Sequence, residues 1–397
     1  MKYNFDEIIE RRNSNAMNTD GWRAYIFGAP DDAVFPYADD EYVRMWVADM
    51  EFAVCPEIID AMQERLNKRI FGYTKIFDKE YYETFAAWCD KMYGWVPKKE
   101  HLFTSPGIIP ALYELVEFLT EPDEKVLIMT PSYAFFMHAI DHSNRTMVCS
   151  DLINDRGNYS IDFEDFEVKA KDPKVKLCIF CNPHNPSGRV WTEEELKRVG
   201  QICKENDVWL ISDEIHCDLL RTGVRHTPMA KVMDWDKVIT CMAPTKTFNI
   251  AGLQISHIMI QNPDLIKIWN AQHFTSENPL SIAASQAAYG KGGEWLAELK
   301  LYLDGNFKFL EDFLKENLPE AVYKIPDATY LAWVDVSAYL PDEDLPMFFA
   351  NNAGVLLEGG NMFVQNSDGY IRLNLAMQRS VLEEGLKRIA EAIKNKK

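Results

Sequence analysis

The chain has 397 residues and a formal net charge of −19, with 47% hydrophobic and 26% charged residues. This is ordinary globular composition, and a chain of this length can build a large core in two or three domains. The acidic balance repels nucleic-acid phosphates and anionic membrane surfaces, so neither is an expected partner. No apolar run reaches the roughly 18 residues of a membrane helix, and the first residues lack the apolar core of a signal peptide.

Eight cysteines are scattered along the chain without the spacing of a disulfide framework. The cytoplasm is therefore the expected compartment. Cys178 and Cys181 match the C-x-x-C form, but they lie in an apolar run that is typical of a strand. Their odd offset puts the two side chains on opposite faces of the strand, which favours core packing over a redox pair. The eight histidines show no metal-ligand spacing, and no metal is expected.

Short, unalternating apolar runs predict strands that are buried on both faces, as in a mostly parallel sheet. In chain order they span residues 126–129, 176–180, 208–211, 238–242 and 257–260. Helical patterns lie between them. Thr192–Glu195 is a capping box followed by an apolar stripe, and residues 263–291 are typical of a helix with a break at Pro279. This alternation predicts a doubly wound α/β domain.

The last third of the chain has the pattern of a smaller α+β unit. Residues 295–318 are typical of a long amphipathic helix, 330–334 and 370–375 of strands, and 380–394 of a closing helix. No Gly/Ser-rich linker precedes this unit, so a continuous helix is expected to join it to the rest. We predict that residues 1–50 contribute to the small domain, that 51–288 form the large cofactor-binding domain, and that 289–397 complete the small domain.

Three polar residues follow the predicted strands closely: Asn185, Asp213 and Lys246. Ligands of open α/β sheets bind beyond the carboxyl ends of the strands, so these residues are expected to share one site. A poorly solvated lysine amine can form a Schiff base with an aldehyde. A carboxylate can keep a pyridine nitrogen protonated, so that the ring draws electrons from a carbanion, and an amide can hold the ring oxygen. The set predicts pyridoxal 5′-phosphate (PLP) as the cofactor.

Four segments in order resemble a known family, and the resemblance covers nearly the whole chain. One looks like the NPxNPxG motif of fold-type I PLP-dependent enzymes in the class I/II aminotransferase superfamily. Together the four resemble the cystathionine β-lyase and C–S lyase branch called MalY/PatB. The implied fold is a large, doubly wound, mostly parallel sheet domain with a small α+β domain. The segments are Trp46-Val47-Ala48-Asp49-Met50, Asn182-Pro183-His184-Asn185-Pro186-Ser187-Gly188, Ser212-Asp213-Glu214-Ile215-His216 and Lys246-Thr247-Phe248-Asn249-Ile250-Ala251-Gly252.

The resemblance implies a role for each matching residue. Lys246 would carry PLP and then act as the catalytic base, Asp213 would pair with the pyridine nitrogen, and Asn185 would bind the ring oxygen. Tyr133 would stack on the ring, and Arg372 would grip the α-carboxylate of the substrate in a bidentate pair. The alternatives are structural roles: a surface lysine, a helix N-cap, a turn residue, a packing tyrosine and a surface arginine.

Gly107, Ile108 and Ile109 match the phosphate loop of the family. A helix that begins near Ile108 would aim its free backbone amides at an anion, and here the donors would be backbone groups only. Tyr73 matches the tyrosine that reaches the phosphate in the neighbouring subunit, which implies a homodimer. A buried structural tyrosine is the alternative.

Three positions depart from the best-known aminotransferases. Ala243 and Gln254 replace a serine and an arginine that contact the phosphate there, so the phosphate would be held with less positive charge. His216 replaces a tyrosine and is still expected among the cofactor-binding residues. These departures are in keeping with the C–S lyase branch.

The resemblance implies an enzyme of sulfur amino acid metabolism. The expected reaction is α,β-elimination of L-cystathionine or a related cysteine S-conjugate to pyruvate, ammonia and a thiol. The alternatives are a PLP-dependent aminotransferase, which would use the same residues, and a regulatory binding protein with a PLP fold. Side-chain specificity would lie in loops, with Tyr25 to Tyr37 among the candidates.

Overall fold

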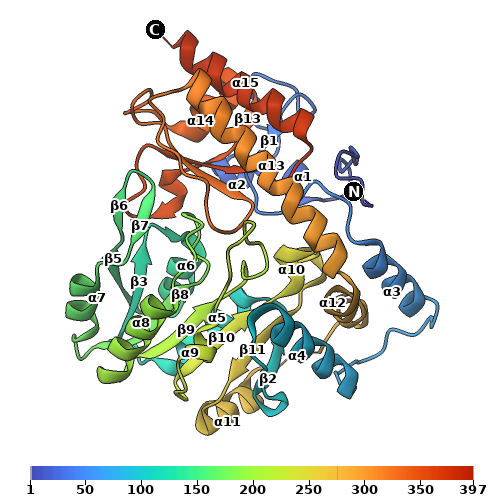
Figure 1. The fold of residues 1–397 in the computed structure, drawn as a ribbon, viewed down its shortest axis with the longest axis vertical. Helices are drawn as coiled ribbons and strands as arrows, with labels where there is room; N and C mark the ends of the chain where they lie inside the picture. The colour runs from blue at the N-terminus through green and yellow to red at the C-terminus, as the bar shows by residue number, and fades with distance from the viewer. Residues whose placement is uncertain (1, 275, 397) are drawn as a thin grey trace.

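A seven-stranded sheet forms the centre of the molecule (Figure 1). It is described here from a computed structural model, in which residues 2–274 and 276–396 are defined. The strands from β10 to β5 pair in parallel, whereas β11 is antiparallel to both of its neighbours. Their order is β2 (Leu102–Ser105), β11 (Ser256–Ile260), β10 (Val238–Met242), β9 (Trp209–Asp213), β8 (Val175–Cys181), β3 (Lys125–Thr130) and β5 (Thr146–Asp151).

The five predicted buried strands are confirmed as β3, β8, β9, β10 and β11. The strands at the two edges of the sheet, β2 and β5, were not predicted from the sequence. Both strands are only partly buried, since Ser150 is the one buried residue of β5. An edge strand is covered less completely than a central one, so it lacks the unbroken apolar run that reveals a central strand in the sequence.

Helices cover both faces of the sheet, as the doubly wound prediction requires. On one face α5 (Ile108–Leu119), α6 (Ala134–His142) and α11 (Pro263–Gln272) share a hydrophobic cluster with Cys181. On the other face α7 (Phe163–Ala170), α8 (Glu193–Glu205) and α9 (Met229–Val232) share a cluster with Cys178. The two cysteines thus lie on opposite faces of β8, and both carry free thiols. The α/β fold class is confirmed.

A smaller unit packs above one end of the sheet (Figure 1). Its three-stranded antiparallel sheet has the order β12 (Leu331–Asp335), β16 (Tyr370–Asn374) and β14 (Glu358–Gly359). Its helices are α13 (Gly293–Asn317), α14 (Leu345–Ala353) and α15 (Arg379–Asn395). Near the other end of the chain, β1 (Val43–Arg44) pairs in parallel with β13 (Val355–Leu356). We propose the division at residues 50 and 288 on this basis, because the pairing ties the first residues to the last part of the chain.

The connection between the two parts differs from the expected continuous helix. Helix α12 (Pro279–Lys291) ends at Gly292, and α13 starts at the next residue. A Cβ atom at Gly292 would lie 2.4 Å from the ring of Phe248, so the close approach of this ring requires glycine. None of the helices that the structure describes combines the length and apolar character that a membrane span requires.

Candidate active site

The carboxyl ends of β8 and β9 face a cavity of about 350 Å³, to which the smaller unit contributes Glu358 and Arg372. The lining brings together every site residue selected from the sequence except Tyr73. These residues are Gly107, Ile108, Ile109, Tyr133, Asn185, Asp213, His216, Lys246 and Arg372. They come from six separate stretches of the chain, so their convergence is a property of the fold rather than of local sequence.

Asp213 is the last residue of β9 and is only 5% exposed. Its Oδ1 accepts a hydrogen bond from the backbone N–H of Ile215 at 3.1 Å. Burial raises the pKa of Asp213 to about 7, although this hydrogen bond and the charge of Lys246 oppose the shift. A buried carboxyl of this kind becomes ionised when a cation is placed beside it. The protonated nitrogen of a pyridine ring is such a cation.

Lys246 lies in α10 (Pro244–Thr247), the short helix that directly follows β10. Its Nζ donates a hydrogen bond to the backbone carbonyl of Ala48 at 2.6 Å. Burial lowers the pKa of Lys246 to about 8, with the charge of Asp49 opposing this shift. The lowered pKa makes the neutral amine, which a lysine needs to attack an aldehyde, far more available near neutral pH than in an ordinary lysine.

Arg372 lies on β16 and is 1% exposed. Its Nη1 donates to Oδ1 of Asn185 at 3.3 Å, which leaves the amide NH2 of Asn185 free to donate elsewhere. Its Nη2 donates to the carbonyl of Trp46 at 3.4 Å and forms an ion pair with Glu358. The Nε of Arg372 is buried without a partner among the described residues. This Nε–H can thus donate to one more anionic group, such as a carboxylate.

Glu358 is a cavity residue that the sequence analysis missed. It lies directly opposite Arg372 in the register of β14 and β16. Burial raises the pKa of Glu358, while Arg372 acts to lower it. The available signal was a lone acidic residue at the end of the apolar run Val355-Leu356-Leu357, since a carboxylate is seldom buried unless it is paired.

The N-terminus of α5 supplies the part of the cavity that suits an anion. Gly107 is the N-cap residue, Ile108 begins the helix as predicted, and no side chain caps it. The free N–H groups of the first turn are therefore available to a phosphate. Thr245 and Gln254 line the same cavity and add two polar side chains to those selected from the sequence.

Tyr25, Tyr133 and His216 add polar groups to the lining, and burial favours the neutral forms of Tyr133 and His216. Burial raises the pKa of Tyr133 well above its ordinary value. Burial also lowers the pKa of His216 to about 3, and the positive charges of Lys246 and Arg372 act in the same direction. The Nδ1 of His216 is buried without a partner among the described residues, so a bound ligand can satisfy it.

Tyr73 lies outside this cavity, in the connection between α3 (Pro56–Leu66) and α4 (Lys79–Tyr93). Its side chain is fully exposed, so it is not the buried structural tyrosine that was the alternative. The role assigned to Tyr73 requires a second copy of the chain and stays a prediction.

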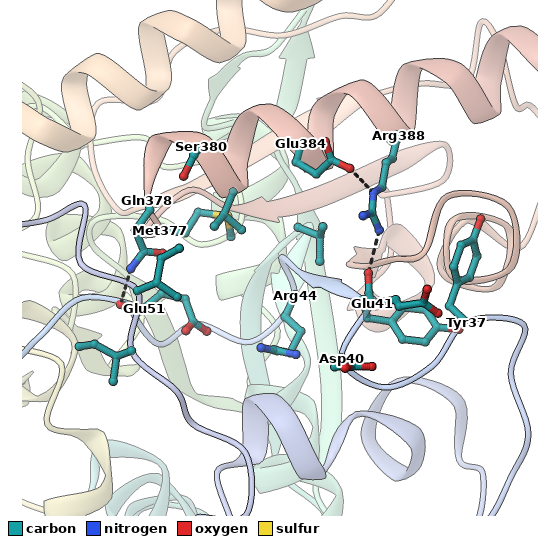
Figure 2. Close-up of a pocket in the computed structure, with 15 residues that line it drawn as sticks. Tyr37, Asp40, Glu41, Arg44, Glu51, Met377, Gln378, Ser380, Glu384 and Arg388 are labelled. Atoms are coloured by element: carbon teal, nitrogen blue, oxygen red, sulfur yellow. Dashed lines mark hydrogen bonds and ion pairs between the residues drawn. The ribbon is translucent and has the colours of Figure 1, made fainter.

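A second cavity, of about 460 Å³, lies between the N-terminal segment and α15 (Figure 2). Arg388 donates to the carbonyl of Glu41 at 2.7 Å, and Gln378 donates to the carbonyl of Glu51 at 2.9 Å. The side chain of Arg44 projects between these two contacts. None of the site residues selected from the sequence lines this cavity.

The first cavity, which is the candidate catalytic cavity, fits PLP at each of its reactive groups. Asp213 suits the pyridine nitrogen, the Lys246 amine the aldehyde, the amide of Asn185 the ring oxygen, and the start of α5 the phosphate. The unpartnered Nε of Arg372 is left for the carboxylate of an amino acid. No group of three or more metal-binding side chains occurs within residues 2–274 and 276–396.

Comparison with known proteins agrees with this chemistry. A family model described as aminotransferase class I and II matches residues 41–389. Cystathionine beta-lyase PatB of Bacillus subtilis is 39% identical over 399 residues, which cover 98% of this chain and 100% of that protein. Protein MalY of Escherichia coli is 29% identical, covering 99% of both chains. The structure of a PLP-bound C–S lyase from Staphylococcus hominis superposes with a TM-score of 0.94 at 52% identity, covering 98% of both chains.

Proposed function

The chain belongs to the aminotransferase class I and II family, and we propose that it is a PLP-dependent carbon–sulfur β-lyase. Its substrate is L-cystathionine or a related cysteine S-conjugate, and its products are pyruvate, ammonia and a thiol. The observation that carries the proposal is the convergence of Lys246, Asp213 and Arg372 in one cavity, within a chain 52% identical to a PLP-bound C–S lyase.

When bound, PLP supplies an aldehyde for the amine of Lys246 and a protonated ring that draws electrons from the α-carbon of the substrate. Asp213 holds the proton on the ring nitrogen by charge pairing. Arg372 binds the α-carboxylate and so fixes the orientation of the bonds to the α-carbon. The free amine at Nζ of Lys246 would take the α-proton of the substrate.

The same amine can complete the elimination. The thiolate leaves the β-carbon with the bonding electron pair, and the Nζ of Lys246 returns a proton to the sulfur atom. The hydrogen bond that Nη1 of Arg372 donates to Oδ1 of Asn185, at 3.3 Å, orients the Asn185 amide. Water then converts the remaining three-carbon fragment into pyruvate and ammonia.

The first prediction tests the reaction type. Purified protein mixed with cystathionine alone should release pyruvate and homocysteine in equal amounts, and Lys246→Ala should release neither. Pyruvate and free thiol are assayed in parallel reactions with and without 2-oxoglutarate. Amino acid consumption that depends on the oxo acid, with no thiol released, would replace the lyase with an aminotransferase.

We further propose a homodimer in which Tyr73 reaches the phosphate site of its partner. In support, the connection between α3 and α4 exposes a group of large hydrophobic side chains that a monomer leaves in water. These are Ile70, Phe71, Tyr73 and Phe77. We also propose that the enzyme acts in the cytoplasm, since all eight cysteines carry free thiols.

A further inference from the structure

Residues 45–52, which we call the strap, connect β1 to the segment before α3 and contain the Trp46–Met50 motif. Val47 and Ala48 of the strap line the catalytic cavity. Glu51 lines the second cavity, as Figure 2 shows. The strap therefore lines both cavities, one with Val47 and Ala48 and the other with Glu51.

Every backbone carbonyl of the strap accepts a hydrogen bond from a residue far away in sequence. Asn374 alone donates to three of them, at Met45, Val47 and Asp49. The carbonyl of Ala48 accepts from both Lys246 at 2.6 Å and Tyr330 at 2.8 Å. The donors are Asn374, Arg372, Lys246, Tyr330, Asn249, Gln378 and also Arg11, whose Nη1 donates to the carbonyl of Met50 at 3.4 Å.

Two residues near the start of the chain, Arg11 and Asn18, bind the side chains of Asp49 and Glu51. Arg11 places Nη2 at 2.6 Å from Oδ2 of Asp49 and Nη1 at 3.1 Å from Oε1 of Glu51. The amide of Asn18 donates to the same two carboxylates at 3.1 and 2.7 Å. All three ionised side chains are largely buried, which makes the ion pairs stronger than exposed ones.

Asp49 is also the carboxylate whose charge acts most strongly on Lys246. Burial lowers the pKa of Lys246 to about 8, and Asp49 is the largest of the effects that raise it again. The other charged or titratable groups that face Lys246 are Arg372, Glu358, Asp213 and His216. Arg11 differs from these groups because it forms an ion pair with Asp49 and does not contact Lys246 directly.

We propose that Arg11 is a positioning residue of the reaction, which acts on Lys246 through Asp49 and the strap. Its ion pairs keep the carbonyl of Ala48 against the Lys246 amine and partly neutralise the carboxylate that this amine faces. The proposal rests on the proposed role of Lys246 as the reacting amine. It holds equally for a lyase and for an aminotransferase.

The neighbouring residue offers a matched control. Arg12 has the same charge and nearly the same sequence position, but its side chain is 48% exposed and contacts only the exposed carboxylates of Glu10 and Asp40. Arg12→Gln therefore removes one positive charge from the neighbouring position and leaves the contacts of the strap unchanged. A surface ion pair of this kind contributes little.

The test measures the pH at which the absorbance of bound PLP changes in the holoenzyme, which reports protonation of the Lys246 nitrogen. In Arg11→Gln, Asp49 loses its cation, so the midpoint should rise by on the order of half a pH unit. In Asp49→Asn the negative charge is lost, so the midpoint should fall. Arg11→Lys should lie between wild type and Arg11→Gln, and Arg12→Gln should match wild type.

Turnover supplies the second readout. The kcat of Arg11→Gln should fall by roughly tenfold with little change in KM, because misplacement of the strap disturbs the base rather than the carboxylate anchor. Midpoints that are unchanged, or that move in the same direction in Arg11→Gln and Asp49→Asn, would refute the proposal. If Arg11→Gln does not fold, Arg11→Lys and Asp49→Asn decide the question. A wild-type protein without PLP absorbance would instead contradict the proposed function.

Discussion

At the residue scale, the site contains ionisable side chains that are buried away from water, where a bound ligand can pair with their charges. Asp213 and Lys246 are shifted in opposite senses, to pKa values of about 7 and about 8, and burial is the main cause of both shifts. Burying either side chain in its ionised form costs free energy. That cost is offset once PLP brings an opposite charge to Asp213 and a covalent bond to Lys246. The cofactor is thus expected to contribute much of the stability of its own site.

Asp213 gives a prediction about pH and stability. Its pKa in the folded protein is about 7, above the value near 3.9 of an unfolded chain. The folded state therefore binds the proton more tightly, and its stability should fall as pH rises from about 4 to about 7. Asp213→Asn removes this dependence, so the cofactor-free variant should melt at a higher temperature than wild type at pH 8, but not at pH 4.

Thermal unfolding of the cofactor-free proteins at both pH values checks this prediction. Asp123→Asn, which alters an aspartate with an 86% exposed side chain, is the control and should behave like wild type. With PLP added the order at pH 8 should reverse, because only wild type gains the charge pair with the ring. If Asp213→Asn is less stable than wild type at pH 8 without PLP, then burial of the ionised Asp213 carboxylate does not destabilise the cofactor-free protein.

At the element scale, the loop after β8 is locked to the smaller unit through Gly188. This glycine has φ of +67°, and a Cβ atom there would lie 2.3 Å from Cβ of Pro326. The backbone N–H of Ala328 donates to the carbonyl of Gly188 at 2.9 Å. The motif that ends in Gly188 therefore also fixes the segment that leads into β12, in addition to placing Asn185 in the cavity.

Gly188→Ala should destabilise the protein by roughly 2–4 kcal/mol, because a left-handed backbone and a steric clash act together. Gly223→Ala is the matched control, since its φ is +87° but no atom lies within 4 Å of the added Cβ. That variant should lose only about 1 kcal/mol, the cost of the backbone conformation. Urea unfolding of both variants measures the difference, and equal losses would show that the clash is relieved.

Burial and strand pairing decide which parts of the structure could be predicted from the sequence. Central strands such as β9 were found because both of their faces are buried, and the residues that follow them led to Asp213 and Lys246. Glu358 was missed because its partner is Arg372, which is adjacent only after β14 and β16 pair. The carbonyl of Ala48 was missed because a backbone oxygen carries no sequence signal; only the tertiary structure puts Lys246 beside it.

At the scale of the whole molecule, the proposed dimer makes a specific prediction. Lys246→Ala and Tyr73→Phe should each be strongly impaired, since one lacks the base and the other lacks a phosphate contact from the partner. Refolded as a mixture, they should regain part of the activity, because one of the two sites in a hybrid dimer contains both groups. Sedimentation of the wild type should give twice the mass of one chain.

Mixing the two folded proteins without a denaturation step is the control, and it should restore little activity if subunits exchange slowly. An active wild-type monomer would rule out the contribution of Tyr73 across an interface. Exposure of Ile70, Phe71 and Phe77 in such a monomer would then need a different explanation.

The strap has a consequence for the order of events on the ribosome. Its residues are synthesised long before Asn374 and Gln378, whose side chains hold it in place. Asn374 and Val47 are separated by 327 positions, which corresponds to tens of seconds of synthesis at roughly 5–20 residues per second. A nascent chain that has passed β11 contains every strand of the central sheet but still lacks Asn374, which holds the strap beside Lys246. Mature affinity for PLP is therefore expected only once the chain has been synthesised through Gln378, because a shorter product lacks the donors that hold the strap.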